Sequence, residues 1–219
     1  MMMNKILVGD VNTILLMHFN NDMTDSSSYA KVFSPQYTDY QSGKFGNAVN
    51  LYNSVRPRCD ISNVDWSNGF TIDFFVKFNT VSSGNYYGIL GTFNDSVLDD
   101  SGFAIHYTSY DNIGFVLVIK GTGESIVYFA SRVTADVDSL FHHFAFTYNK
   151  SDLTVFKDGI KLGTYTVGLK SINPTSLDLG RWTFSSAGAN IDAIMDELRI
   201  SNIVRWTADF TPPTAPYTI

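Results

Sequence analysis

Cysteine, glutamate and charged residues in general are scarce in this chain of 219 residues. The one cysteine, Cys59, excludes an internal disulfide and fits synthesis in a reducing compartment. Glu124 and Glu197 are the only glutamates, so aspartate supplies most of the acidity, and aspartate favours turns where glutamate favours helices. Charged residues make up 16% of the chain, against 15% aromatic and 44% hydrophobic residues. This composition indicates a packed β-rich domain and argues against disorder.

Long apolar runs and an excess of positive charge are also missing. No apolar stretch approaches the length that spans a bilayer. The run Ile6-Leu7-Val8 is too short for the core of a signal peptide, and no small-residue cleavage site follows it. We therefore expect synthesis in a cytoplasm without Sec export. The net charge of -6 repels phosphate backbones, so we expect neither nucleic-acid binding nor membrane insertion.

Alternation of apolar and polar residues is the dominant pattern that is present. From Phe70 to Phe78 every second residue is apolar, and Phe75 alone interrupts the polar positions, which predicts a strand covered on both faces there. Asp158-Gly159 lies between two apolar runs and predicts a β-hairpin. About a dozen short strands, with few helical signals, predict an all-β, two-sheet antiparallel sandwich.

Six short segments follow one another in a recognisable order. They are Leu15-Leu16-Met17-His18-Phe19 with Asp25-Ser26-Ser27; Lys44-Phe45-Gly46-Asn47-Ala48; Phe70-Thr71-Ile72-Asp73-Phe74-Phe75-Val76; Phe141-His142-His143-Phe144-Ala145-Phe146-Thr147-Tyr148; Val155-Phe156-Lys157-Asp158-Gly159; and Met195-Asp196-Glu197-Leu198-Arg199-Ile200. As an ordered set they resemble the laminin-G-like, concanavalin A-like lectin family. This resemblance implies a jelly-roll sandwich, often a structural calcium ion, and binding to glycans or proteins.

Two departures and a second resemblance accompany this match. Phe75 and Phe141 stand where the family often has tryptophan, and Asn20-Asn21 stands where an Asp-Gly turn is usual. The ending resembles the ends of such domains in bacteriophage structural proteins. It runs from Arg199-Ile200-Ser201 through Arg205-Trp206-Thr207 to Phe210-Thr211-Pro212-Pro213.

The expected organisation is one domain with two short extensions. Residues 1–13 form an N-terminal arm, residues 14–202 the lectin-like jelly-roll domain, and residues 203–219 a proline-rich tail. The prolines prevent the tail from pairing as a central strand, so it is expected to pack on the domain or on a neighbouring subunit.

Asp196 is the main candidate for a metal ligand. Strict alternation places it on the same face as Ile194, Leu198 and Ile200, and a carboxylate on a core face needs hydrogen-bond partners or a metal. Calcium prefers oxygen ligands. The resemblance therefore implies one structural calcium ion, with Asn21, Asp22, Asp25 and Asp196 as its predicted ligands. The alternative is that Asp196 accepts hydrogen bonds from loop amides without an ion.

Aromatic and acidic loop residues are the candidates for sugar binding, because aromatic rings stack on the C–H faces of sugars while Asn and Asp bind hydroxyls. The predicted residues are Tyr86, Tyr87, Asn94, Asp95, Asp99 and Trp182. The alternatives are ordinary packing of the aromatic rings, a contact with a partner subunit, and, for the loop 94–101, a solvated surface or a second calcium site.

The sequence contains no catalytic constellation. His142 and His143 are adjacent on a predicted strand, so one is expected in a hydrogen-bonded buried position and the other at the surface. The two glutamates lie in separate segments, whereas glucanases of this superfamily place their carboxylates on one strand face. Neither a Gly-x-Ser-x-Gly motif nor a phosphate-binding loop is present, so we expect no enzyme activity.

These observations favour a non-enzymatic, lectin-like module on the surface of a phage virion, made in the host cytoplasm. Its expected partners are surface glycans and the capsid or tail proteins of the particle, and it is open to homo-oligomer formation. The alternative is a structural decoration or assembly protein without glycan binding. A glycoside hydrolase is the third and disfavoured hypothesis.

Overall fold

The computed structural model describes residues 10–37, 39–52, 56–81, 86–93, 101–109, 114–125, 127–130, 137–180 and 191–218. All regular structure in these residues is β-strand, which confirms the predicted fold class. None of the described segments is a helix that could cross a membrane.

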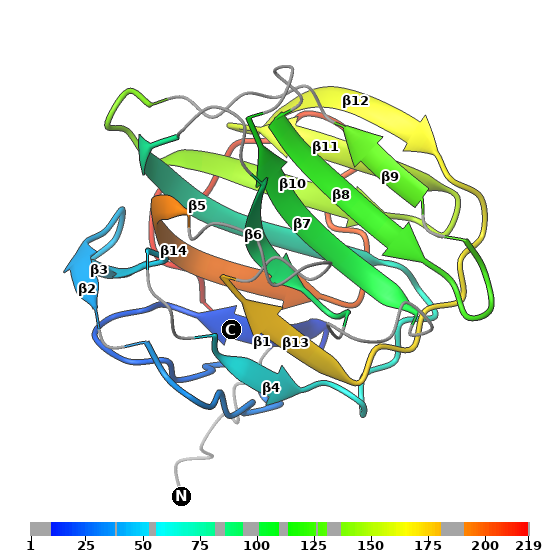
Figure 1. Cartoon of the computed structure of the whole chain (residues 1–219), viewed down its shortest axis with the longest axis horizontal. Coiled ribbons are helices and arrows are strands. Elements are labelled where there is room, and N and C mark those ends of the chain that lie inside the picture. The colour runs from blue at the N-terminus through cyan, green and yellow to red at the C-terminus, as the bar shows by residue number, and fades with distance from the viewer. Residues whose placement is uncertain are drawn as a thin grey trace, which may run out of the picture.

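Two antiparallel sheets stack face to face, and the smaller sheet lies in front of the larger one in Figure 1. The eight-stranded sheet has the order β12-β11-β10-β5-β14-β3-β2, and β1 pairs with β14. Its strands are β1 (Thr13–Met17), β2 (Tyr40–Ser42), β3 (Asn47–Asn50), β5 (Phe70–Thr80), β10 (His142–Tyr148), β11 (Asp152–Lys157), β12 (Ile160–Thr166) and β14 (Asp192–Ser201). The six-stranded sheet has the order β4-β13-β6-β7-β8-β9. It contains β4 (Arg58–Asp60), β6 (Tyr86–Gly91), β7 (Gly102–Thr108), β8 (Gly114–Lys120), β9 (Val127–Ala130) and β13 (Ser176–Leu179).

Aromatic side chains fill the space between the sheets. The predicted alternation in β5 is confirmed, since Phe70, Phe74 and Phe78 all point into this core. Phe115 of the smaller sheet meets Phe144 of the larger one with ring centroids 4.5 Å apart. Burial of each such ring contributes about 2–3 kcal/mol to folding, so the alternating pattern is enough to set which face of a strand is inside.

Phe75 lies on the outer face of the larger sheet and is nevertheless buried, as its place in the pattern predicts. The ring of Phe45 packs edge-on against it at 5.4 Å, and His143 packs against it at 4.8 Å. The loop that contains Lys44 and Phe45 therefore covers the centre of β5 from outside.

The Asp158-Gly159 hairpin is also confirmed. Both residues have positive φ values, 50° and 79°, and they connect β11 to β12. Positive φ at both central positions is typical of the type I′ turn that favours this dipeptide. A side chain at Gly159 would collide with the carbonyl of Phe210, so the turn is also where the C-terminal segment packs closely.

Candidate functional site

The outer face of the larger sheet is occupied by the chain's own C-terminal segment. Trp206 and Phe210 stack with ring centroids 3.9 Å apart and an interplanar angle of 8°. Phe210 also contacts Phe156 of β11 and His143 of β10. Within this chain, the segment therefore packs on β10 and β11 of its own larger sheet.

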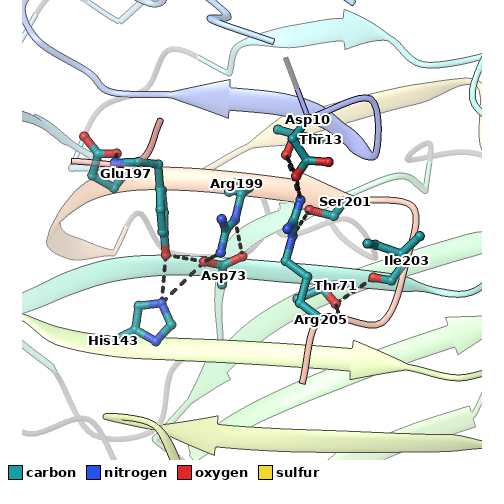
Figure 2. A network of polar contacts seen from close by, with 11 residues as sticks. Asp10, Thr13, Thr71, Asp73, His143, Glu197, Arg199, Ser201, Ile203 and Arg205 are labelled. Carbon is teal, nitrogen blue, oxygen red and sulfur yellow. Dashed lines mark hydrogen bonds and ion pairs between the residues drawn. The ribbon is translucent and has the colours of Figure 1, made fainter. Parts of the chain in front are cut away.

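A buried ionic network holds this segment, as Figure 2 shows. Arg199 donates from Nε to Asp73 Oδ1 at 3.1 Å and from Nη2 to Asp73 Oδ2 at 3.0 Å. The Tyr217 hydroxyl donates to Asp73 Oδ2, and His143 Nε2 lies 2.9 Å from that hydroxyl. Arg199 also packs over the Tyr217 ring at 3.9 Å. Burial alone would raise the pKa of Asp73, but the hydrogen bond with His143 and the Arg199 charge outweigh it and lower that pKa.

Asp, His and Tyr side chains also occur together in catalytic sites, but the cluster of Asp73, His143 and Tyr217 is not accessible to solvent. Asp73 and His143 are fully buried, and Tyr217 is nearly so. The cluster has the geometry of an anchor, because every group in it joins the sheet to the C-terminal segment. His143 is thus the buried member of the histidine pair, whereas His142 is partly exposed. The Nδ1 atom of His142 lies 2.6 Å from Asp158 Oδ2, and its Nε2 atom lies 3.1 Å from Asp138 Oδ2.

A second anchor joins the C-terminal segment to the first described residues of the chain. Arg205 pairs with Asp10 and donates to Ser201 Oγ at 2.6 Å and Thr13 Oγ1 at 2.8 Å (Figure 2). Burial tends to raise the pKa of Asp10, but hydrogen bonds from Arg205 and its neighbours lower it to about 2. Thr71 of β5 completes the anchor, since its hydroxyl donates to the Ile203 carbonyl at 2.8 Å.

The face predicted for Asp196 was wrong, because β14 contains a bulge. Asp196 pairs with Phe75 and Arg199 with Asp73, so two residues of β14 lie opposite one residue of β5. Glu197 takes a φ of 52° at this point. The extra residue reverses the alternation, and Asp196 lies on the outer face with Arg199 while Leu198 and Ile200 face the core.

Asp196 is fully buried beneath the loop 43–46. The Phe45 amide donates to Asp196 Oδ2 at 2.8 Å, while Oδ1 has no hydrogen-bond partner among the described residues. A side chain on Gly43 would come within 2.6 Å of Oδ2, so glycine is what allows this close approach. Burial raises the pKa of Asp196 to about 6. A buried carboxylate oxygen without a hydrogen-bond donor is stabilised when its charge is neutralised, either by a bound cation or by a proton.

Asp25, another predicted calcium ligand, is held by hydrogen bonds from its own surroundings. Asp25 accepts hydrogen bonds from the amides of Leu16, Ser27 and Lys31 and from the Ser27 hydroxyl. These four donors occupy its lone pairs, so Asp25 offers no vacant position to an ion. Asp22 is exposed and accepts from the Thr24 amide at 2.8 Å. The described residues hold no group of three or more His, Cys, Asp or Glu side chains that could bind a metal.

Two polar residues outside the predicted ligand set, Asn20 and His18, bond to the segments next to Asp196. Asn20 accepts from the Asn47 amide at 2.8 Å, at the far end of the same loop. His18 Nδ1 lies 2.8 Å from Glu197 Oε1, and this hydrogen bond with the carboxylate raises the His18 pKa. Asn21 is exposed, with a φ of 67°. Asp196 and Asn20 thus both accept hydrogen bonds from amides of the segment 45–47, whereas Asp25 accepts from the amides of Leu16, Ser27 and Lys31.

The predicted sugar-binding residues differ in how far they are exposed to solvent. Tyr86 is 43% exposed at the start of β6. Tyr87 is only 4% exposed and lies in the core beside Tyr107, so its inclusion in a sugar site was wrong. Asn94, Asp95, Asp99 and Trp182 lie outside the described residues.

Comparison with known proteins places the chain in a family. Residues 51–209 match the family described as the concanavalin A-like lectin/glucanases superfamily. No curated protein sequence matches the chain.

Three solved structures share the fold at low sequence identity. The binding domain of Paraclostridial Mosquitocidal Protein 1 has a TM-score of 0.68 and 14% identity, over 88% of this chain and 49% of that one. The botulinum neurotoxin serotype D ligand binding domain in complex with N-acetylneuraminic acid has a TM-score of 0.64 and 13% identity, over 89% and 48%. Domain 4 of AbnA, a GH43 extracellular arabinanase from Geobacillus stearothermophilus in complex with arabinotriose, has a TM-score of 0.66 and 18% identity, over 87% and 92%.

The chain spans about half the length of the two toxin domains and nearly the whole of the arabinanase domain. At these identities the likeness is one of fold. The family match covers most of the chain, and by this match the chain belongs to the concanavalin A-like lectin/glucanases superfamily.

Proposed function

We propose that this chain is a non-enzymatic, lectin-like module that binds glycans. The observation that carries the proposal is the family match over residues 51–209. The arabinanase domain, which holds arabinotriose and is similar over almost its full length, adds support. The sialic-acid-bound toxin domain supports it less, because half of that domain has no counterpart here.

The geometry favours binding at loops. Residues 203–218 cover the outer face of the larger sheet, so a glycan cannot lie there without displacing the anchored segment. The buried acids are also engaged: Asp73 pairs with Arg199, and Glu197 bonds with His18 and the Tyr217 amide. Carboxylates held in this way are poor candidates for acid–base catalysis, which supports a binding role.

We place the module on the surface of a phage virion, next to capsid or tail proteins, after synthesis in the host cytoplasm. The support is the resemblance of residues 199–213 to the ends of phage structural proteins. Many copies on one particle would convert weak single-site binding into strong attachment.

A glycan array probed with the purified chain tests the proposal. We expect binding to a defined set of glycans, without release of reducing sugar when the same glycans are incubated with the protein. An array without binding to any glycan (a flat array) would contradict the binding role. Release of reducing sugar that persists after the protein is repurified would contradict the non-enzymatic role.

A structural calcium ion is part of the proposal. Asp196 and Asn20 flank the loop 43–47, and Asp196 Oδ1 is a buried oxygen without a hydrogen-bond partner among the described residues. A cation there would neutralise the Asp196 carboxylate and tie the loop to β14.

The alternative of a virion assembly protein is favoured by one observation. β12 is at the end of the strand order, and its Ile160 and Leu162 are 55% and 44% exposed. Exposed apolar residues on an edge strand are typical of a surface that pairs with another protein. Stoichiometric incorporation into particles, lost in Ile160→Lys and combined with a flat array, would favour this alternative.

A further inference from the structure

A pocket of about 390 Å³ opens at one end of the sandwich, where three loops from distant parts of the sequence meet. The residues 64–67 precede β5, Lys150 lies in the turn between β10 and β11, and residues 169–173 connect β12 to β13. Its volume lies at the lower end of the range for small-molecule sites, which are about 300–1,000 Å³.

The floor of the pocket is apolar and rigid. Val64, Trp66 and Ile172 line it and are themselves buried. Trp66 is held from below by Phe70 and Phe103, with ring centroids 6.2 Å and 5.4 Å away. The Trp66 indole nitrogen has no hydrogen-bond partner among the described residues. Because this nitrogen is enclosed, Trp66 contributes an apolar edge to the floor of the pocket.

The rim carries polar groups in fixed positions. Asp65 accepts from the Ser67 amide at 2.9 Å and the Ser67 hydroxyl at 3.1 Å, and each carboxylate oxygen keeps a further lone pair. These hydrogen bonds, with the charge of Lys150, lower the pKa of Asp65 and keep it ionised. Lys150 and Asn173 complete the rim.

The third loop is held against the core from behind. The Lys170 amide donates to the Tyr148 hydroxyl at 2.7 Å, and that hydroxyl donates to the Gly168 carbonyl at 3.2 Å. The Lys170 ammonium lies 2.5 Å from Glu124. Because the loop is fixed before binding, little ordering entropy is lost when a ligand enters.

We propose that this pocket is a subsite for one ring of a neutral glycan, with its apolar edge on the floor formed by Val64, Trp66 and Ile172 and its hydroxyls bonded to Asp65, Lys150 and Asn173. The inference rests on the proposed lectin-like function and gives it a location. A neutral sugar is favoured over an acidic one because the two lysines are offset by Asp65 and Glu124, which leaves no net positive charge. An apolar floor with a few converging donors and acceptors is the usual construction of such sites.

The test uses methyl pyranosides of glucose, galactose, mannose and N-acetylglucosamine as probes at millimolar concentration. The readout is the Trp66 indole N–H resonance, identified with a Trp66→Phe variant. We expect at least one probe to shift this resonance in a saturable way. Asp65→Asn and Lys150→Ala should each weaken that binding about ten-fold, since each removes a hydrogen bond with a charged group.

Asp60→Asn is the matched control. Asp60 accepts from the Ser62 amide at 2.7 Å and the Ser62 hydroxyl at 2.6 Å, which is the same local arrangement as at Asp65, but it lies outside this pocket. We expect Asp60→Asn to bind as the wild type does. A glycan that binds on the array without moving the Trp66 resonance, or whose binding survives both pocket variants, would overturn the pocket assignment and leave the lectin-like function standing. Tighter binding of glucuronic acid or N-acetylneuraminic acid would overturn the neutral selectivity, and a flat array together with an unmoved resonance would refute both proposals.

Discussion

Replacing Asp73 with Asn tests whether the buried ionic network secures the C-terminal segment. The carboxylate is fully buried and accepts two bonds from Arg199 and one from the Tyr217 hydroxyl. Asn has nearly the same shape, but its amide nitrogen faces one of these donors and its neutral charge leaves the Arg199 cation buried without a counter-ion. Removing one partner of a buried ion pair costs about 3–5 kcal/mol.

That cost is a large share of the roughly 5–15 kcal/mol by which a domain is stable. It corresponds to a fall in the melting midpoint of about 6–20 °C for a chain of this size. The free energy of unfolding should be measured by urea titration at neutral pH, with circular dichroism following the sheets. Limited proteolysis of the native state adds a local readout, because cleavage within residues 203–218 should accelerate more than global unfolding explains.

Asp192→Asn is the control on the same two strands. Asp192 also accepts hydrogen bonds across the β5–β14 pair, from Asn79 at 2.9 Å and Thr80 at 2.6 Å, but it does so at an exposed position. Its replacement should cost less than about 1 kcal/mol. If Asp73→Asn costs no more than Asp192→Asn, the network is not what holds the segment, and its apolar stacking must suffice.

Three further predictions concern Asp196 and the turn at Gly159. Burial raises the pKa of Asp196 from 3.8 to about 6, so between these pH values the folded protein binds a proton that the unfolded chain has lost. The free energy of unfolding of the metal-free protein should therefore fall as the pH rises from about 4 to about 6. Urea titrations should show a weaker pH dependence for Asp196→Asn, and an unchanged dependence would contradict this prediction. Calcium should raise the melting midpoint of the wild type above its value in chelator and should have no effect on Asp196→Asn; identical midpoints with and without chelator would remove the ion from the proposal. Gly159→Ala should destabilise the protein by more than Gly123→Ala, because both glycines have positive φ but only Gly159 lies against Phe210. Thermal melting measures both variants. Equal falls in the melting midpoint would show that the C-terminal segment is not packed on the turn.

Local patterns predicted much of the fold. The β5 alternation, the Asp158-Gly159 hairpin and the opposite orientations of His142 and His143 depend on period two and on turn geometry, which neighbouring residues decide. Phe75 is informative in the same way, because an apolar residue at a polar position indicated that something covers the outer face. What covers it was not predictable, since Phe45 lies thirty positions earlier in the chain.

The errors at the candidate site have a common physical cause. The bulge at Glu197 places a non-glycine residue at positive φ, and neither the residue nor its neighbours mark it. One extra residue was enough to move Asp196 to the opposite face. Tyr87 was misplaced for a related reason, because adjacent tyrosines on a strand point in opposite directions and the sequence does not say which is inside.

The sequence by itself determined the fold class, the family and the inward face of most strands. The reason is that alternation of apolar side chains is a local pattern, and burial of those side chains contributes strongly to the free energy of folding. Only the tertiary structure decided which residues meet. Asp73, His143, Arg199 and Tyr217 come from four separate segments, and the walls of the pocket beside Trp66 come from three. Their proximity depends on sheet order, register and a single bulge, which are set by the packing of the whole chain.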